Sequence, residues 1–519
     1  MEQISIFDFT AKEKFKIDKP IRLIELFAGY GSQALALRYL GIPFENWKIS
    51  EWAIKSIQAY KDLHNTSDSS DYSADKTIEE IRTWLCGRIS ADYNTPLTSE
   101  QVKRRSEKEL RTIYNNMVAT NNIGSITNIT RSDLQIEDTD KYDYILTYSF
   151  PCQDLSSAGK GAGMGKGSGT RSGLLWEVER LLKETKELPQ VLLMENVPEV
   201  IGSKNIKHFA KWVEFLDNLG YRSKWGLLNA KDFGIAQNRN RCFMVSVLGD
   251  YYYDMPTGFK LEHVLKDFLD KGVDESYYLK DETIRSLNLH KERHEAQGHG
   301  FGWKPSNGGG IAHTIKTECG YRPDSNFIIE QSGKGDRESR NGSCEHDNGE
   351  RLQRVWQSSD ERSVRENRGG WDKMHDIAKR VYSADGLSPI LHTCGGGNLE
   401  PKILEEPIVY DDYNGRIRAD QSTDGALTTT CGNDAPRNGV KLIEPNYRVR
   451  KLTERECGKL MGVKPEDCKK IARNLSKSAQ YHCYGDSIVV TVLMALFGEM
   501  TNIDFYTKIK QTVEEILNE

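Results

Sequence analysis

Residues 21–33 decide the fold, and they read Ile21-Arg22-Leu23-Ile24-Glu25-Leu26-Phe27-Ala28-Gly29-Tyr30-Gly31-Ser32-Gln33. The first seven predict a strand, residues 28–33 predict a turn, and Ala34 to Leu40 predict a helix that Gly41 can end. A strand, a glycine turn and a helix in this order begin a doubly wound α/β fold that binds a nucleotide. Ala34 stands where Gly-x-Gly-x-x-Gly has its last glycine, which favours a compact nucleoside ligand over a pyrophosphate.

The next part of the chain adds an acid and an insertion. Residues 44–50 predict a strand, and Glu51 follows it, twenty residues after Gly31, where an acid can bind both ribose hydroxyls. The alternative is a solvated surface glutamate. Residues 61–122 resemble an insertion with predicted helices at 77–86 and 99–119. Its run Lys103-Arg104-Arg105 could touch phosphate, although such a run is more often a solvated face.

A second strand, predicted at 142–148, leads into Ser149-Phe150-Pro151-Cys152-Gln153. Open α/β sheets bind ligands beyond the ends of such strands, and Pro151 limits the backbone that aims the thiol. The alternative is an ordinary buried cysteine. Residues 159–173 hold seven glycines and few large apolar groups. They predict a mobile segment that covers a site as a lid.

Two further strand ends carry polar groups. The apolar run 190–194 delivers Glu195-Asn196-Val197-Pro198, and Glu195 shares an edge with Cys152 if the two strands are parallel. Another strand is predicted at 221–228. Residues 237–241 then read Gln237-Asn238-Arg239-Asn240-Arg241 and lead into a strand at 242–248. Arginines two residues apart in extended chain point the same way, although each could be a surface residue.

Length, charge and cysteine usage bound the class of protein. The 519 residues allow two or more domains, and a net charge of −5 gives no general basic signature for nucleic acid, so DNA would need a local patch. Ten cysteines without a Cys-x-x-Cys pair argue against a disulfide scaffold and a zinc ribbon. Without a cationic signal region or an apolar run of membrane-spanning length, the chain is expected to be soluble and cytoplasmic, with no membrane partner.

Four motifs occur in order: Phe27-Ala28-Gly29-Tyr30-Gly31, Pro151-Cys152-Gln153, Glu195-Asn196-Val197 and Gln237-x-Arg239-x-Arg241. Together they resemble the DNA (cytosine-5-)-methyltransferase family of bacterial or phage type. Residues 450–462 and 484–490 are similar to that family's last two motifs. The resemblance covers about 1–60, 120–248 and 446–519.

The resemblance implies a class I, Rossmann-like methyltransferase fold with S-adenosylmethionine as cofactor. It implies a catalytic domain at 1–248 with the helical insertion at about 61–122. A β-rich target recognition domain follows at 249–445, and residues 446–519 return to the catalytic domain. A helix from Ser487 to Met494 is expected to pack beside the glycine turn.

The resemblance also implies the site residues. The catalytic set is Cys152, Glu195, Arg239, Arg241, Pro151, Gln153 and Asn196. The cofactor-binding set is Phe27, Ala28, Gly29, Tyr30, Gly31, Glu51, Trp52, Ser125, Ile126, Asp486 and Ser487. Two of these depart from the family pattern, because Ser125 replaces an Asp and Asp486 replaces an Asn.

The chemistry explains why these residue types are needed. A thiolate that adds to C6 of cytosine makes C5 nucleophilic, and Cys152 supplies it. Glu195 can relieve the charge at N3 only as a neutral acid, so we expect burial to raise its pKa. Arg239 and Arg241 can bind the O2 side. The target base must leave the duplex, and no metal is required.

The resemblance makes duplex DNA the expected substrate. The lid, Asp154 to Ser172, and the recognition segment are expected to hold it. A six-residue repeat begins at Ile315, Ile390 and Leu427, and each copy is trailed by a strand-like stretch, at 327–330, 402–405 and 441–444. A small β scaffold without DNA contacts is the alternative. The DNA-binding candidates are Ser156, Lys160, Lys166, Arg171, Gln237, Arg380 and Arg416.

A monomer in the cytoplasm of a bacterium or phage-infected cell is expected, with a cognate restriction endonuclease as a candidate partner. Two alternatives stay open. One is methylation of RNA cytosine, and the other is a DNA-binding homologue without turnover.

Overall fold

The computed structural model describes residues 13–151, 155, 163–167, 169–296, 305–317, 325–331, 381–383, 402–404, 408–411, 416–417, 440–443 and 447–518. The chain forms two compact units. The first contains Met1–Tyr277, Ser306–Phe327 and Lys451–Glu519, and the second contains Tyr278–Pro305 and Ile328–Arg450. The domain boundaries proposed above remain a prediction, but the first unit reaches past residue 248 and takes up a segment near 315 as well.

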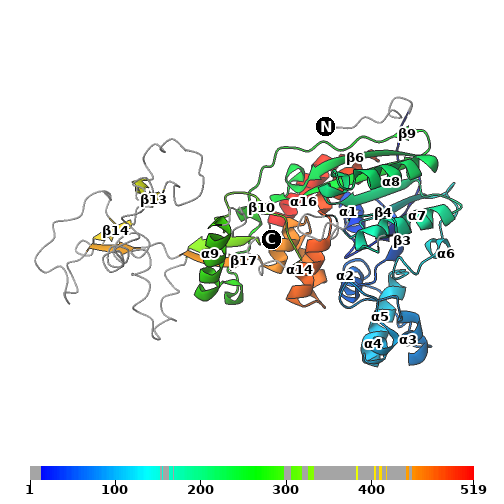
Figure 1. Ribbon diagram of the computed structural model, residues 1–519, viewed down its shortest axis with the longest axis horizontal. Helices are drawn as coiled ribbons and strands as arrows, with labels where there is room; N and C mark the ends of the chain where they lie inside the picture. The colour runs from blue at the N-terminus through cyan, green and yellow to red at the C-terminus, as the bar shows by residue number, and fades with distance from the viewer. Residues whose placement is uncertain are drawn as a thin grey trace, which may run out of the picture. The chain divides into compact units, whose positions relative to one another are not determined.

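A six-stranded sheet is the centre of the first unit, in the order β3-β2-β4-β5-β8-β6 (Figure 1). Strands β2, β3, β4 and β5 run parallel, and β8 runs antiparallel to both β5 and β6. The expected mostly parallel, doubly wound sheet is therefore confirmed. The strands are β2 (Ile21–Leu26), β3 (Phe44–Ser50), β4 (Asp143–Tyr148), β5 (Val191–Asn196), β6 (Tyr221–Asn229) and β8 (Asn240–Leu248).

Burial on both faces explains the composition of the central strands. All six residues of β4 and all six of β5 are buried. Helices α7 (Leu175–Glu184) and α8 (Ile206–Asn218) contribute Leu175, Leu182, Phe209 and Trp212 to the same core. Strands covered in this way read as continuous apolar runs, as 191–194 do, whereas 143–148 also contain the buried polar residues Asp143 and Thr147.

Helix α1 (Ser32–Leu40) follows the glycine turn, as predicted. Gly31 and Gly41 flank it with left-handed backbone, at φ 83° and 75°, and Gly41 donates its backbone N–H to Arg38 and Leu37. A left-handed glycine just after the last turn is a common helix stop. Helix α1 packs against α15 (Val490–Gly498) and α16 (Phe505–Leu517), so the C-terminal segment returns to the first strand–turn–helix unit.

The insertion forms a helical lobe of its own, below the sheet in the view of Figure 1. Helices α2 (Ile54–His64), α3 (Ile78–Leu85), α4 (Ser99–Lys103) and α5 (Glu107–Ala119) enclose a small core that includes Ile81, Leu85 and Leu110. The single helix predicted at 99–119 is wrong. A turn at residues 104–105 ends α4, and the hydroxyl of Ser106, whose backbone is extended, caps α5 by accepting from the Glu109 N–H.

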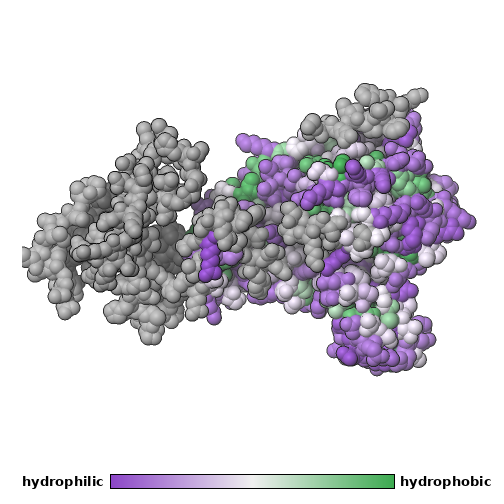
Figure 2. Space-filling model, viewed as in Figure 1, coloured by the Kyte–Doolittle hydropathy of each residue, from purple (hydrophilic) through white to green (hydrophobic). Residues whose placement is uncertain are grey.

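The lobe is mainly hydrophilic on the face seen in Figure 2. Its charges pair with one another. Lys103 lies 3.6 Å from Glu100, Arg105 pairs with Glu109, and Arg111 lies 2.7 Å from Glu107. These pairs favour a solvated face over phosphate contact for this charge run.

The tail contains α12 (Glu454–Leu460), α13 (Pro465–Ala472) and α14 (Lys477–Asp486) before α15 and α16. The helix predicted from Ser487 is wrong at its start, because Ser487 is extended and the next helix begins at Val490. Among the described residues, only the stretch Lys477–Gly498 is long and apolar enough to span a membrane, and it is 83% buried inside the fold. That burial is typical of a core helix.

Short elements complete the described chain. In the first unit, β1 (Glu13–Lys14) pairs with β9 (Tyr251–Tyr252), and β7 (Gln237–Asn238) pairs with β10 (Ala312–His313). Helix α6 (Arg131–Leu134) precedes β4. The second unit contains α9 (Asp281–Ala296), β12 (Val381–Ser383), β13 (Lys402–Leu404), β14 (Ile408–Asp411), β15 (Arg416–Ile417) and β16 (Val440–Ile443). It also contains all but one terminal residue of β11 (Phe327–Gln331) and of β17 (Tyr447–Lys451).

The second unit is β-rich in its described part. Strand β14 lies between β15 and β16, β12 pairs with β13, and β11 pairs with β17. The three strand-like stretches that trail the repeats are strands β11, β13 and β16. Fully buried Arg450 donates from Nε to Glu330 (2.7 Å), which also accepts from the Tyr278 hydroxyl (2.6 Å). The repeat copies after residues 390 and 427 lie outside the described residues.

Candidate active site and cofactor pocket

The carboxyl ends of β4 and β5 bring the two predicted catalytic motifs to one edge of the sheet. The strands are parallel neighbours, with Tyr148 opposite Met194. Just beyond them, the Ser149 hydroxyl donates to the Glu195 carboxylate, and the Asn196 side-chain amide donates to the Phe150 carbonyl (2.8 Å). The chain leading to Pro151 is therefore fixed beside Glu195. Cys152 and Gln153 lie outside the described residues.

Arg241 completes this polar cluster. Its Nε lies 3.3 Å from Oε1 of Glu195, and the two side chains are 17% and 7% exposed. Both groups are thus withdrawn from bulk water but open on one side, which strengthens electrostatic contacts with a bound base. Ser149, Glu195 and Arg241 form what we call the edge cluster.

The next residue, Cys242, also carries a thiol, but it cannot serve as the nucleophile. It is fully buried, and burial together with the nearby Glu195 charge raises its pKa to about 12. A thiol that stays protonated is inert toward electrophiles. Of the two cysteines close in sequence to the edge cluster, Cys152 is the one that remains as the candidate.

The structure separates Arg239 from Arg241. The Arg239 guanidinium donates to three backbone carbonyls, those of Ile315 (2.9 Å), Gly485 (2.9 Å) and Ser487 (2.6 Å). Its side chain is buried and turned toward the tail. The expectation that both arginines reach the base is therefore corrected for Arg239, which joins the 315 segment and the tail to the sheet.

Gln237 is likewise placed away from DNA. It is fully buried, its Nε2 donates to the Leu460 carbonyl (2.5 Å), and its Oε1 accepts from the Ile315 N–H (2.8 Å). The expected DNA contact is wrong for this residue, because both ends of its amide are already bonded inside the fold. The sequence carries no signal that separates buried Gln237 and Arg239 from exposed ones.

The predicted cofactor residues gather at the neighbouring strand ends. Phe27 and Gly29 have left-handed backbone, at φ 60° and 57°, so the turn after β2 bends back on the end of β3. There the Glu51 carboxylate accepts the N–H groups of Gly29 (2.8 Å) and Ala53 (2.7 Å). Burial raises the pKa of Glu51 to about 7 in spite of these bonds.

Asn122 is a residue of this pocket that sequence reasoning missed. Its side-chain oxygen accepts the N–H groups of Glu51 (3.2 Å) and Gly124 (2.9 Å), and its Nδ2 donates to the Glu51 carbonyl (2.9 Å). It thereby fixes the third predicted segment beside Glu51. Next to it, the Ser125 hydroxyl lies 2.9 Å from that of Thr127, and Ile126 is buried in the sheet core.

The tail supplies the remaining residues of the predicted cofactor site. A Cβ placed on Gly29 would lie 3.6 Å from the Ser487 hydroxyl, so the last motif faces the glycine turn. Tyr30 packs edge-on against Tyr484 at 5.9 Å between ring centroids. Asp486, the residue that departs from the family pattern, lies 3.1 Å from Nε2 of His482. Ala28 is buried, and the Trp52 carbonyl accepts the Ser90 N–H (2.7 Å).

Helix α2 packs against the glycine turn. His64 Nε2 lies 2.9 Å from the Tyr30 carbonyl, and the Tyr60 hydroxyl donates to buried Glu25 (2.6 Å). A Cβ on Gly31 would stand 2.5 Å from the rings of both His64 and Tyr60. Gly31 is thus required for close approach as well as for its left-handed backbone.

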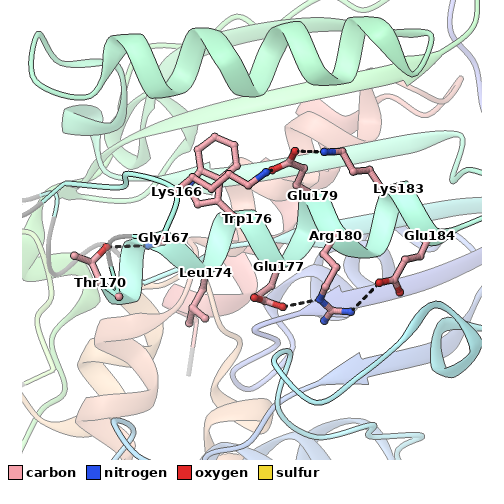
Figure 3. A pocket seen from close by; sticks show the side chains of 12 residues that line it. Lys166, Gly167, Thr170, Leu174, Trp176, Glu177, Glu179, Arg180, Lys183 and Glu184 are labelled. Atoms are coloured by element: carbon pink, nitrogen blue, oxygen red, sulfur yellow. Dashed lines mark hydrogen bonds and ion pairs between the residues drawn. The ribbon is translucent and has the colours of Figure 1, made fainter.

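The described lid residues have partners within the protein. Lys166 and Lys183 both pair with Glu179 of α7, at 2.6 and 2.5 Å (Figure 3). Burial alone would raise the pKa of Glu179, but these two lysines outweigh it and lower that pKa. A hollow of about 750 Å³ lies here, lined by Lys166, Trp176, Arg180 and their neighbours on α7.

The other DNA-binding candidates are only partly placed. Arg171 is half-buried at the start of the 3₁₀ turn that precedes α7. Arg416 lies on β15, and the placement of its side chain is not described. Ser156, Lys160 and Arg380 lie outside the described residues.

Comparison with known proteins agrees with this geometry. The family model of C-5 cytosine-specific DNA methylases matches residues 97–502 of this chain. The orphan methyltransferase M.SssI of Spiroplasma monobiae is 38% identical over 261 residues, which cover 50% of this chain and 67% of that protein. The type II methyltransferase M2.ScrFI of Lactococcus lactis is 36% identical over 270 residues, covering 51% and 71%. The orphan methyltransferase M.SPBetaI of Bacillus phage SPbeta is 26% identical over 525 residues, covering 92% and 97%.

The fold, the edge cluster and the predicted cofactor residues after β2 and β3 define a methyltransferase of the class I type. The chain belongs to the C-5 cytosine-specific DNA methylase family and is a DNA (cytosine-5-)-methyltransferase.

Proposed function

We propose that this enzyme transfers a methyl group from S-adenosylmethionine to C5 of a flipped-out cytosine in a specific duplex DNA sequence. The observation that carries the proposal is the edge cluster. Glu195, at the end of β5, lies between Ser149 and Arg241. Ser149 follows β4 directly, and Cys152 comes three residues later in the chain. A carboxyl group and a guanidinium at this edge, with a cysteine three residues further along the chain from Ser149, match the needs of addition to a pyrimidine ring.

The residues of the neighbouring pocket fit S-adenosylmethionine. The glycine turn brings backbone close to a nucleoside, and the buried acid Glu51 stands at the end of the adjacent strand. The wall formed by Ser487 faces Gly29. Phe27, Ala28, Tyr30, Gly31, Trp52, Ser125, Ile126 and Asp486 complete the proposed set. The bound cofactor supplies a methyl group on a positively charged sulfur, ready for attack by a carbon nucleophile.

Cys152 is the proposed nucleophile. Its thiolate forms a bond to C6 of cytosine, and the electron pair of the C5–C6 double bond becomes available at C5. C5 takes the methyl group while the bond between the methyl carbon and the cofactor sulfur breaks, which would leave S-adenosylhomocysteine. A base then removes the C5 proton, the double bond re-forms, and the bond between sulfur and C6 breaks to return the thiolate. Pro151 and Gln153 are proposed to aim the thiol.

Glu195 and Arg241 stabilise the charge that this addition creates. Glu195 presents its carboxyl group to N3, and Arg241 offers a guanidinium beside it for the O2 side. Asn196 acts indirectly in this proposal, because its amide holds the Phe150 carbonyl and with it the strand end that leads to Cys152.

Duplex DNA is the proposed partner, because the chain belongs to a family of DNA methylases. The target base must be extruded from the duplex, because a stacked base exposes neither face to a thiol. The lid with Ser156, Lys160, Lys166 and Arg171 is proposed to close over the extruded base. Arg380 and Arg416 of the β-rich segment are proposed to contact DNA. We further propose a monomer that acts in the cytoplasm of a bacterium or phage-infected cell, with a restriction endonuclease as a candidate partner.

The direct test is transfer of a labelled methyl group to DNA. Purified enzyme, methyl-labelled S-adenosylmethionine and unmethylated genomic DNA should yield label in 5-methylcytosine after digestion to nucleosides. Transfer RNA in place of DNA should receive none. Label on tRNA but not on DNA, or on an adenine, would contradict the proposal.

A further inference from the structure

One aromatic residue of the helical lobe reaches the cofactor pocket, although no family motif contains it. Residues 89–95, here called the lobe loop, run beside the end of β3. The Ser90 N–H donates to the Trp52 carbonyl (2.7 Å), and the Ser90 carbonyl accepts the Ile54 N–H (3.0 Å). The loop is thereby fixed to the chain that directly follows Glu51.

The loop itself is rigidly built. The Asp92 carboxylate accepts the N–H groups of Asn94 and Thr95, both at 2.9 Å, and the Ser90 hydroxyl at 3.0 Å. Between these bonded residues, Tyr93 adopts left-handed backbone at φ 61°. A bulky residue in that region is strained by about 1 kcal/mol or more, and such strain is concentrated at functional sites.

The Tyr93 ring packs directly against the tail. It lies 3.7 Å from the ring of His482, centroid to centroid, and its hydroxyl oxygen is shielded from solvent. Burial raises the pKa of Tyr93, and the groups that raise it further are Cys483, Glu51 and Asp486. Tyr93 thus stands among residues from two walls of the pocket, the end of β3 and the last motif.

The same ring contact connects Tyr93 to Asp486 of the last predicted motif. Nε2 of His482, the partner of the Tyr93 ring, lies 3.1 Å from Oδ2 of Asp486. The lobe loop therefore contacts the tail at His482, next to Asp486.

We propose that Tyr93 is a cofactor-binding residue, an aromatic wall that the lobe contributes to the S-adenosylmethionine pocket. The inference rests on the proposed function, because it takes the pocket of Glu51, Gly29 and Ser487 as the cofactor site. An aromatic face can stack on adenine or attract a sulfonium cation. The insertion then has a role in binding, beyond packing its own small core.

The test compares Tyr93→Ala and Tyr93→Phe in the full-length enzyme, by calorimetric titration with S-adenosylmethionine and S-adenosylhomocysteine. Loss of the ring should weaken binding of S-adenosylmethionine by about 3- to 10-fold, the usual worth of one aromatic contact, and Tyr93→Phe should restore most of it. The KM for the cofactor should rise in parallel, while the KM for DNA stays unchanged. A larger loss for S-adenosylmethionine than for S-adenosylhomocysteine would place the ring at the sulfonium, and an equal loss would place it at the adenosine.

Two further variants separate binding from folding. Tyr93→Gly suits the left-handed backbone, so it should keep or raise the melting temperature and still lose affinity. Tyr72→Ala removes another tyrosine of the lobe, one that is 37% exposed and bonded to Asp68, and should leave affinity unchanged. If Tyr93→Ala binds within twofold of wild type, or more tightly, the inference is wrong. If wild type itself binds neither compound, the proposed function fails instead.

Discussion

At the scale of single residues, the two arginines of one motif have different surroundings. The Arg239 guanidinium donates to three backbone carbonyls, two buried and one partly buried, whereas Arg241 lies against Glu195. Removing Arg239 leaves those carbonyls without their donors, and charge-assisted bonds of this kind are each worth about 1.5–3 kcal/mol. We expect Arg239→Ala to lower the free energy of unfolding by about 3 kcal/mol or more in urea titrations.

Arg241→Gln is the matched variant. It keeps a donor beside Glu195 but removes the charge, so we expect little change in unfolding free energy and a kcat reduced by at least about tenfold. Equal stability losses in the two variants, or an unchanged kcat in Arg241→Gln, would show that Arg239 and Arg241 do not have separate structural and catalytic roles.

Glu25 makes a prediction about pH. Burial raises its pKa from 4.5 to about 7, although the Tyr60 hydroxyl and the Ala34 N–H donate to it. Between about pH 4.5 and 7, Glu25 therefore stays protonated in the folded state, whereas the unfolded chain has released this proton. This contribution to stability is complete below pH 4.5 and is lost as pH rises through 7.

Glu25→Gln should remove that dependence. We expect the variant to be more stable than wild type at pH 8, by up to about 3 kcal/mol, and close to it at pH 5. Part of the slope should persist, because the pKa of Glu51 is also raised to about 7. Chemical denaturation at pH 5, 6, 7 and 8 measures the unfolding free energy of both proteins. A variant whose unfolding free energy changes with pH as steeply as that of wild type would refute this account of Glu25.

At the scale of elements, the tail docks on the 315 segment through a glycine. A Cβ on Gly485 would lie 2.3 Å from the Thr317 nitrogen and 2.5 Å from the Lys316 carbonyl carbon, so the two backbones meet where no side chain fits. We expect Gly485→Ala to lower the melting temperature, with a cost of about 1–3 kcal/mol from the forced shift. Because Ser487 follows in the cofactor pocket, the KM for S-adenosylmethionine should rise too.

Gly310→Ala is the control for this prediction. Its backbone is not left-handed, and a Cβ there would meet nothing within 4 Å. It should leave both stability and KM unchanged. A Gly485→Ala protein that behaves like Gly310→Ala would mean that the tail and the 315 segment do not pack this closely.

At the scale of the whole molecule, the sheet and its catalytic edge could be predicted because their signals are local. Strand β3 occupies the predicted range, and the motifs after β2, β4 and β5 stand at strand ends whose order follows from parallel pairing. The break between α4 and α5 could also have been predicted, because Ser106 and Glu109 have the spacing of a helix cap.

The rest depends on tertiary contacts that no local pattern carries. Gln237 and Arg239 resemble surface residues of a recognition motif, and only the folded chain shows that the tail and the 315 segment bury them. Asn122 and Tyr93 belong to no motif, and they reach the pocket because the lobe folds back on the end of β3.

The central claim is that Cys152 adds to the base while Glu195 and Arg241 hold it. Duplex DNA in which every cytosine is replaced by 5-fluorocytosine tests this whatever the recognition sequence, because fluorine at C5 cannot leave as a proton and the adduct is trapped. With S-adenosylmethionine, wild-type enzyme should form a covalent complex that survives denaturing gel electrophoresis, and Cys152→Ser should form none. Absence of the complex with active wild-type enzyme, or its persistence in Cys152→Ser, would contradict the account.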